Sequence, residues 1–170
     1  ADTFRFLQAK QLFTTDDLDT ALHSMQNSIS AMKASAGEKQ SRIKELDELL
    51  RMAQYYVDGK PVADKLGSIR FEKSRQKYKS ENDEHDNELR TFYMAERKLK
   101  PYFKDGKIPI TAWRRERERL EQEYKDIQTE LSPLYADVKK LWAIHYNIYE
   151  VQHEQEQQAQ LRSRKNEIEL

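Results

Sequence analysis

The sequence has no cysteine, and it holds only four glycines and four prolines among 170 residues. Without cysteine, disulfides and thiolate metal sites are excluded, and a cytoplasmic location is the natural expectation. So few loop-forming residues argue against a β-sandwich and against alternating strands and helices. No apolar run approaches the length of a membrane span, so we expect no membrane insertion.

The chain also lacks an excess of charge of either sign. Thirty Lys and Arg residues balance thirty Asp and Glu residues, which gives a formal net charge of +0. No overall electrostatic attraction to nucleic acid or membrane follows from this balance. Charged residues make up 35% of the chain and apolar residues 37%, a mixture typical of long helices and coiled coils. Disorder is the competing interpretation, but nine Tyr, six Phe and two Trp are unusual in disordered chains.

Apolar residues are strictly periodic in the first third of the chain. Between Leu18 and Val57 they recur at alternating steps of four and three, and only Lys39 interrupts the seam. This spacing predicts a coiled-coil-like helix. The threonine and two aspartates at 15–17 are a good helix start, because Thr15 can cap the first turn and the acids favour the positive end of the helix dipole.

Two similar turn sequences then divide the chain into three helices. Residues 58–61 read Asp-Gly-Lys-Pro, and residues 105–109 read Asp-Gly-Lys-Ile-Pro. Glycine supplies a left-handed exit from a helix, and proline cannot continue a helix but can start one. The turns predict helices over about 15–57, 62–103 and 111–155. We expect the Gln-rich, charged tail over 156–170 to fray or extend into solvent.

Three helices of matched length joined by short turns favour antiparallel neighbours. The sequence therefore predicts an all-α domain over residues 1–155: a three-helix antiparallel, coiled-coil-like rod, roughly 60 Å long, preceded by a short N-terminal helical segment. Paired residue numbers should sum to about 119 across the first turn and to about 214 across the second. Trp142 and Tyr146 should then meet Leu49 and Leu50 at one end of the rod.

Residues suited to chemistry are scattered. The histidines stand at positions 23, 85, 145 and 153, without the close spacing of a metal site, so we expect no metal and no cofactor. The glycines stand alone, so no phosphate-cradling loop is predicted. Glu81, Glu84 and Glu88 could suggest an acid–base pair, but a thin helical rod offers no cleft that excludes water. We expect no catalytic residues and no enzymatic activity in this chain.

One basic stretch is a candidate for contacts with DNA phosphates. Its members are Lys65, Arg70, Lys73, Arg75, Lys77 and Lys79, which face a single acid, Glu72. The plain interpretation is a solvated helix face with ion pairs worth a few tenths of a kcal/mol each. The functional interpretation is weak, non-specific binding of DNA through its phosphates.

Several segments resemble a known family. They are Thr14-Thr15-Asp16-Asp17-Leu18, Ile43-Lys44-Glu45-Leu46-Asp47-Glu48-Leu49, and above all Gly106-Lys107-Ile108-Pro109-Ile110 with Trp113. Over roughly residues 4–150 the chain resembles the helical region downstream of the nuclease domain in relaxases, the Mob-type mobilisation proteins of bacterial plasmids and conjugative transposons. That family uses a metal-binding histidine cluster with a nicking tyrosine, and nothing in this chain matches it.

The resemblance implies a non-catalytic interaction or spacer module that contributes to protein docking or DNA holding during conjugative transfer. Its expected partners are conjugation accessory or coupling proteins, DNA, or a second copy of the chain. Because the chain opens at Ala1 without an initiator Met, we expect the nuclease domain to lie upstream in a longer protein. The alternative is a coiled-coil scaffold or oligomerisation domain unrelated to DNA.

Overall fold

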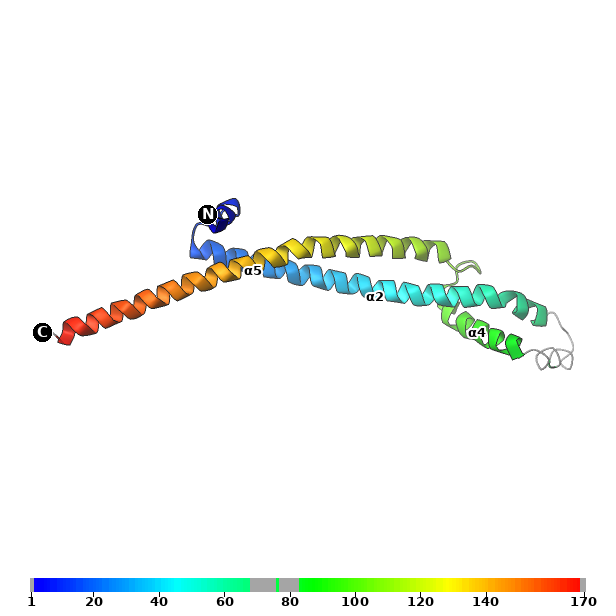
Figure 1. Cartoon of the computed structure of the whole chain (residues 1–170). Helices are drawn as coiled ribbons and strands as arrows, with labels where there is room; N and C mark the ends of the chain where they lie inside the picture. Colours follow the sequence, from blue (N-terminus) through cyan, green and yellow to red (C-terminus); the bar gives the residue numbers. More distant parts are fainter. Residues whose placement is uncertain (1, 68–75, 77–82, 169–170) are drawn as a thin grey trace. The chain divides into compact units, whose positions relative to one another are not determined.

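The computed structural model describes residues 2–67, 76 and 83–168. These residues form an all-α protein without named strands, as the sequence predicts, and a short N-terminal helix is present. The elements are α1 (Asp2–Ala9), α2 (Thr15–Gly67), α4 (Asp83–Leu99), the 3-10 helix η1 (Lys100–Tyr102) and α5 (Ile110–Ile168), and Figure 1 labels the long helices. Within these residues no helix is both long and apolar enough to cross a bilayer.

The chain packs as two units, and each is described by itself. Unit 1 comprises Ala1–Ala36 and Lys125–Leu170, and unit 2 comprises Gly37–Tyr124. Helices α2 and α5 each contribute to both units, since their bounds cross both divisions. In unit 2, residues of α2, α4 and α5 share one core.

The core of unit 2 is built from one side of each of these helices. Its buried members are Leu46, Leu49, Met52, Ala53, Ala95, Leu99, Trp113 and Leu120. Ion pairs flank this core and fix α2 antiparallel to α5. Lys39 Nζ lies 2.6 Å from Glu123 Oε2, and Arg42 Nε lies 2.9 Å from Glu116 Oε1. The partner of the higher-numbered residue on α2 is the lower-numbered residue on α5, which shows that the two helices run in opposite directions.

The first predicted turn, at residues 58–61, is wrong. Helix α2 runs without a break through Gly59 and Pro61 to Gly67, ten residues beyond the predicted end at Val57. Helix α4 is antiparallel to α2, but in a different register from the predicted sum of about 119. Lys98 Nζ lies 3.2 Å from Glu48 Oε1, whereas a turn at 58–61 would have placed Glu48 near residue 71.

Burial beyond the proline explains why the helix continues. Ala63 and Leu66 are buried with Leu89 and Phe92 of α4 in a second cluster of unit 2. A proline inside a helix costs about 3 kcal/mol, and burial of a single leucine returns about 1.5–3 kcal/mol. The apolar face of α2 therefore extends past Pro61 and keeps the chain helical.

A turn is present at the second predicted position, residues 105–109. Asp105 and Gly106 have positive φ angles of 49° and 73°, and the backbones of Lys104 and Lys107 exchange two hydrogen bonds of 2.9 Å. The Trp113 N–H then donates to the Pro109 carbonyl at 3.0 Å in the first turn of α5. The predicted reversal at this turn is wrong, however. Both α4 and α5 are antiparallel to α2, so they run in the same direction, and the predicted sum of about 214 does not hold.

The second predicted helix, over 62–103, is only partly described. Residues 62–67 belong to α2, and α4 with η1 covers 83–102. Residues 68–75 and 77–82 lie outside the described part of the chain.

In unit 1, α1 packs against α2 and α5. Leu18 and Leu22 of α2 and Leu141 of α5 form a buried cluster, against which Phe6 and Leu7 of α1 pack. Lys10, the residue after α1, also forms an ion pair with Asp137 of α5, and the Lys140 ammonium lies 4.1 Å from the centre of the Phe6 ring.

The start of α2 is capped one residue earlier than predicted. The Asp17 N–H donates to Thr14 Oγ1 at 3.1 Å, and the Thr14 N–H donates back to the Asp17 carboxylate at 2.9 Å. This reciprocal pair is a capping box, so Thr14 rather than Thr15 is the cap. The hydrogen bonds, led by the one from the Phe13 N–H, lower the pKa of Asp17.

The predicted end of the third helix near residue 155 is wrong, and the tail does not fray: α5 continues to Ile168 and extends into solvent, the other alternative for this segment. Its residues from Glu150 to Lys165 are all exposed. Gln, Glu, Arg and Lys are good helix formers, and adding residues to an existing helix costs far less than starting a new one. Helix α5 therefore extends beyond the part that packs against other elements of its unit.

Candidate protein-interaction surface

The predicted DNA-contacting patch is described at one position only. Lys65 lies exposed in the last turn of α2. The other five members lie outside the described residues: Arg70, Lys73, Arg75, Lys77 and Lys79. The patch therefore stays a prediction from the sequence.

The arginine-rich start of α5 is tied into unit 2 by ion pairs. Arg117 pairs with Asp47 of α2 and with Glu121 of its own helix. Arg42 donates two hydrogen bonds to the Glu116 carboxylate, and these lower the pKa of Glu116. Glu116 and Arg117 thus have structural partners in the packing of α2 against α5.

The histidines lie apart and make local contacts. His145 Nε2 lies 2.9 Å from Asp19 Oδ1, which joins α5 to α2 in unit 1. His85 lies 3.5 Å from Glu88 on α4, and the His153 ring stacks on Tyr149 with 6.0 Å between ring centres. Over residues 2–67, 76 and 83–168, no group of three or more His, Cys, Asp or Glu side chains could hold a metal ion.

Four exposed aromatic residues share one side of α5 in unit 1, and we call them the α5 aromatic face: Tyr135, Trp142, Tyr146 and Tyr149. Their exposed fractions are 42%, 47%, 61% and 57%. Steps of seven, four and three residues place them in one line along a helix. The prediction that Trp142 and Tyr146 would be buried with Leu49 is wrong, because Leu49 packs with Trp113 instead.

Neighbouring polar groups hold this face in place without covering it. The Lys33 ammonium of α2 lies 5.4 Å from the centre of the Tyr135 ring, and His145 meets Trp142 edge-on at 5.5 Å. The negative charge of Glu150, one turn farther along α5, raises the pKa of the Tyr146 phenol. The sequence signal for this face was its spacing. The same spacing marks the neighbouring apolar seam, in which Leu131 and Leu141 are buried and Leu134 and Val138 are partly buried.

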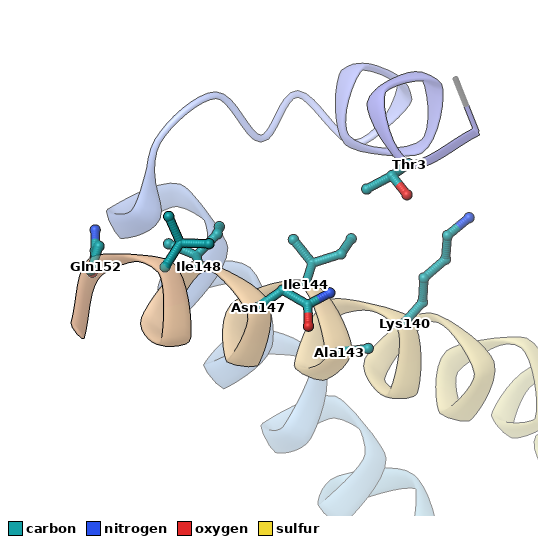
Figure 2. Close-up of a pocket in the computed structure, with 8 residues that line it drawn as sticks. Thr3, Lys140, Ala143, Ile144, Asn147, Ile148 and Gln152 are labelled. Atoms are coloured by element: carbon teal, nitrogen blue, oxygen red, sulfur yellow. The ribbon is translucent and has the colours of Figure 1, made fainter. Parts of the chain in front are cut away.

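A groove lies on a neighbouring face of α5, between that helix and α1. Its cavity has a volume of about 460 Å³, and its lining includes Ile144, Ile148 and Val151 of α5 and Thr3 of α1. Figure 2 shows Ile144 and Lys140 extending from α5 toward α1, with Thr3 on the other side of the opening. The α1–α5 groove is mainly apolar and suits an apolar side chain rather than a charged ligand.

Together these features suit association with protein. A face that carries four half-exposed aromatic rings loses unfavourable contact with water when a partner covers it. Tyr and Trp are among the residues enriched at protein interfaces, since they combine a large apolar area with a polar group. In comparisons with known proteins, no family model, no curated protein and no solved structure matches the chain.

Proposed function

We propose that the chain is a non-catalytic helical interaction module of a DNA-mobilisation relaxase, and that the α5 aromatic face is its contact surface. The observation that carries the interaction role is the exposure of Tyr135, Trp142, Tyr146 and Tyr149 along one line of α5. Surface aromatics scattered singly are ordinary, whereas a contiguous line of them marks a surface that another protein covers.

Support for the relaxase comes from the segment between α4 and α5. The resemblance is most specific at Gly106-Lys107-Ile108-Pro109-Ile110 with Trp113. In the fold, Gly106 supplies the positive φ angle, while Ile108, Ile110 and Trp113 belong to the core of unit 2. A segment in which each position has such a task is a distinctive mark of one fold, and this favours shared descent over the general likeness of coiled coils.

The competing function is that of an oligomerisation scaffold unrelated to DNA. The same line of aromatic residues favours it, because a heptad-spaced seam on one helix is how coiled-coil scaffolds associate. The two functions differ in what the longer protein does. The reading frame upstream of the Ala1 codon separates them: a histidine-rich nuclease domain there supports the relaxase, and an unrelated domain contradicts it.

The functional test uses the full-length protein of that reading frame in two assays. The double variant Trp142→Glu, Tyr146→Glu should reduce the frequency of plasmid transfer at least about tenfold, since a charge on the contact surface must be desolvated on docking. Nicking of the cognate DNA in vitro should stay within about twofold of wild type, because the variant leaves the nuclease domain intact. The control is Tyr55→Glu, which places the same charge at an exposed tyrosine of unit 2.

Unchanged transfer in the double variant would contradict the docking role, as would an equal loss in the control. The DNA-holding role has a separate test. If it is right, substitution of Arg70, Lys73 and Lys77 lowers the affinity of the chain for a DNA duplex and flattens its dependence on salt. Undetectable binding of the wild-type chain at low salt would dismiss that role.

A further inference from the structure

We infer that the α5 aromatic face binds a second copy of this chain, with the two α5 helices antiparallel and centred between Asn147 and Ile148. The inference rests on the proposed interaction role of this face and names its partner. It does not require that the longer protein be a relaxase.

The first support is the exposure of this face within unit 1. There α5 shares a buried cluster with α2, against which residues of the short helix α1 pack. Neither helix buries the α5 aromatic face, whose four rings are 42% to 61% exposed. A further helix could therefore pack on this face.

The second support is the free end of α5. The pairing of His145 with Asp19 places the start of α2, at Thr15, near residue 149 of α5. From Glu150 to Lys165, α5 is helical and wholly exposed. Isolated helices of this length are marginal in water, so this segment gains most by packing against another surface. An antiparallel second copy provides one: each free end lies along the aromatic face of the other copy.

The third support is that the seam is complementary to itself. Continued at heptad spacing, it runs through positions 135, 139, 142, 146, 149, 153, 156 and 160. In the antiparallel pair, Tyr146 meets the second copy's Tyr149, and Trp142 meets its His153. Lys139 meets its Glu156, so unlike charges face each other twice, whereas like charges do not meet in the seam.

The aromatic rings supply much of the buried area that a dimer needs. Aromatic side chains bury about 150–250 Å² when fully covered, so each half-exposed ring would bury on the order of 100 Å². Eight such rings from two copies contribute about 800 Å², and the seam and its flanking residues add to this toward the roughly 1,200 Å² of a stable interface.

Sedimentation equilibrium of the purified chain, without DNA or other proteins, tests the inference. Between about 1 and 500 µM the wild-type mass should rise from that of one chain to that of two. Trp142→Glu with Tyr146→Glu should remain monomeric throughout, and Tyr55→Glu should behave as wild type. Lys139→Glu and Glu156→Lys should each weaken association about tenfold, and the two together should restore it, because the pair is then reversed.

Cross-linking tests the orientation, because the sequence has no cysteine of its own. Mixed Tyr146→Cys and Tyr149→Cys chains should form disulfides with each other faster than either forms with itself. Faster self-linkage of Tyr146→Cys would overturn the antiparallel arrangement, and a monomeric wild type at every concentration would overturn the inference altogether. If the wild-type chain is a monomer but the Trp142 and Tyr146 variants still lose plasmid transfer, the face binds a partner other than a second copy, and only the dimer is contradicted. If the wild-type chain is a dimer but these variants transfer normally, the dimer stands and the proposed function is contradicted.

Discussion

Gly59 of α2 lies so close to Phe92 of α4 that a Cβ on the glycine would stand 2.6 Å from the Cβ of the phenylalanine. The Phe92 Cβ is fixed to its backbone, so the two helices would have to move apart. Gly59→Ala should therefore destabilise unit 2 by about 1–3 kcal/mol, although alanine favours a helix. Urea unfolding followed by Trp113 fluorescence, in a Trp142→Phe background, measures this in unit 2.

Gly37 is the matched control for that change. It also lies inside α2, and nothing stands within 4 Å of the Cβ it would gain. Gly37→Ala should stabilise the same unit by about 0.5–1 kcal/mol, because only the helix propensity changes. If Gly59→Ala and Gly37→Ala changed the stability of unit 2 in the same direction, the close approach of α2 and α4 at Gly59 would be contradicted.

The left-handed residue in the α4–α5 turn gives a further prediction. Gly106 has a φ angle of 73° and open space around its missing Cβ. Gly106→Ala should cost about 1–2 kcal/mol through backbone strain alone, since L-residues disfavour this region. The same urea titration reports it, and a neutral substitution would show that the turn has another conformation.

The cap of α2 can be tested with two adjacent threonines. Thr14→Ala removes the hydroxyl that accepts the Asp17 N–H, so it should destabilise unit 1 by about 1 kcal/mol. Thr15→Ala removes an exposed hydroxyl from the first turn and should change stability by less than about 0.5 kcal/mol. Trp142 fluorescence in a Trp113→Phe background follows unit 1. Equal effects of the two substitutions would show that the capping box is not formed.

Acid should weaken unit 2 through Glu116. The hydrogen bonds from Arg42 hold the pKa of Glu116 below its ordinary value of 4.5. A carboxylate with a lowered folded-state pKa stabilises the fold above its unfolded pKa and loses this contribution as pH falls through the folded value. The coupling between Arg42 and Glu116 should be about 0.2–1 kcal/mol at pH 7, because both side chains are partly exposed.

A double-mutant cycle of Arg42→Met and Glu116→Gln, measured at pH 7 and pH 3, tests that pair. The coupling energy should be present at the higher pH and should shrink at the lower one. A coupling energy that is larger at pH 3 than at pH 7 would contradict an ion pair between the Arg42 guanidinium and the Glu116 carboxylate.

The helical class and the second turn could be predicted from the sequence because their signals are local. Heptad spacing reports one apolar side of a helix. Asp105 and Gly106 take left-handed conformations, which glycine adopts because it lacks a Cβ and which aspartate tolerates better than most residues. The first turn could not be predicted in this way. Gly59 and Pro61 carry the same local signal as the true turn. The glycine instead serves a close helix contact, and the joint burial of Ala63 and Leu66 with α4 offsets the cost of the proline.

The α5 aromatic face was missed for a related reason. The apolar seam through Leu131 and Leu141 stands out in the sequence, and the fold buries both residues. Trp142 stands next to that seam, and apolarity alone does not tell which of two adjacent helix faces meets a partner within the chain. Only the position of α2 along α5, fixed by contacts such as His145 with Asp19, shows which face remains uncovered.

Amide hydrogen exchange along α5, measured at several protein concentrations, tests most directly whether its exposed end packs on a second copy. Residues 150–165 have no covering element in unit 1, so at low concentration they should exchange nearly as fast as an unfolded peptide. At high concentration their exchange should slow by about tenfold or more, while Leu46 and Leu99 in the core of unit 2 stay equally protected throughout. Exchange in residues 150–165 that does not depend on concentration would contradict the association.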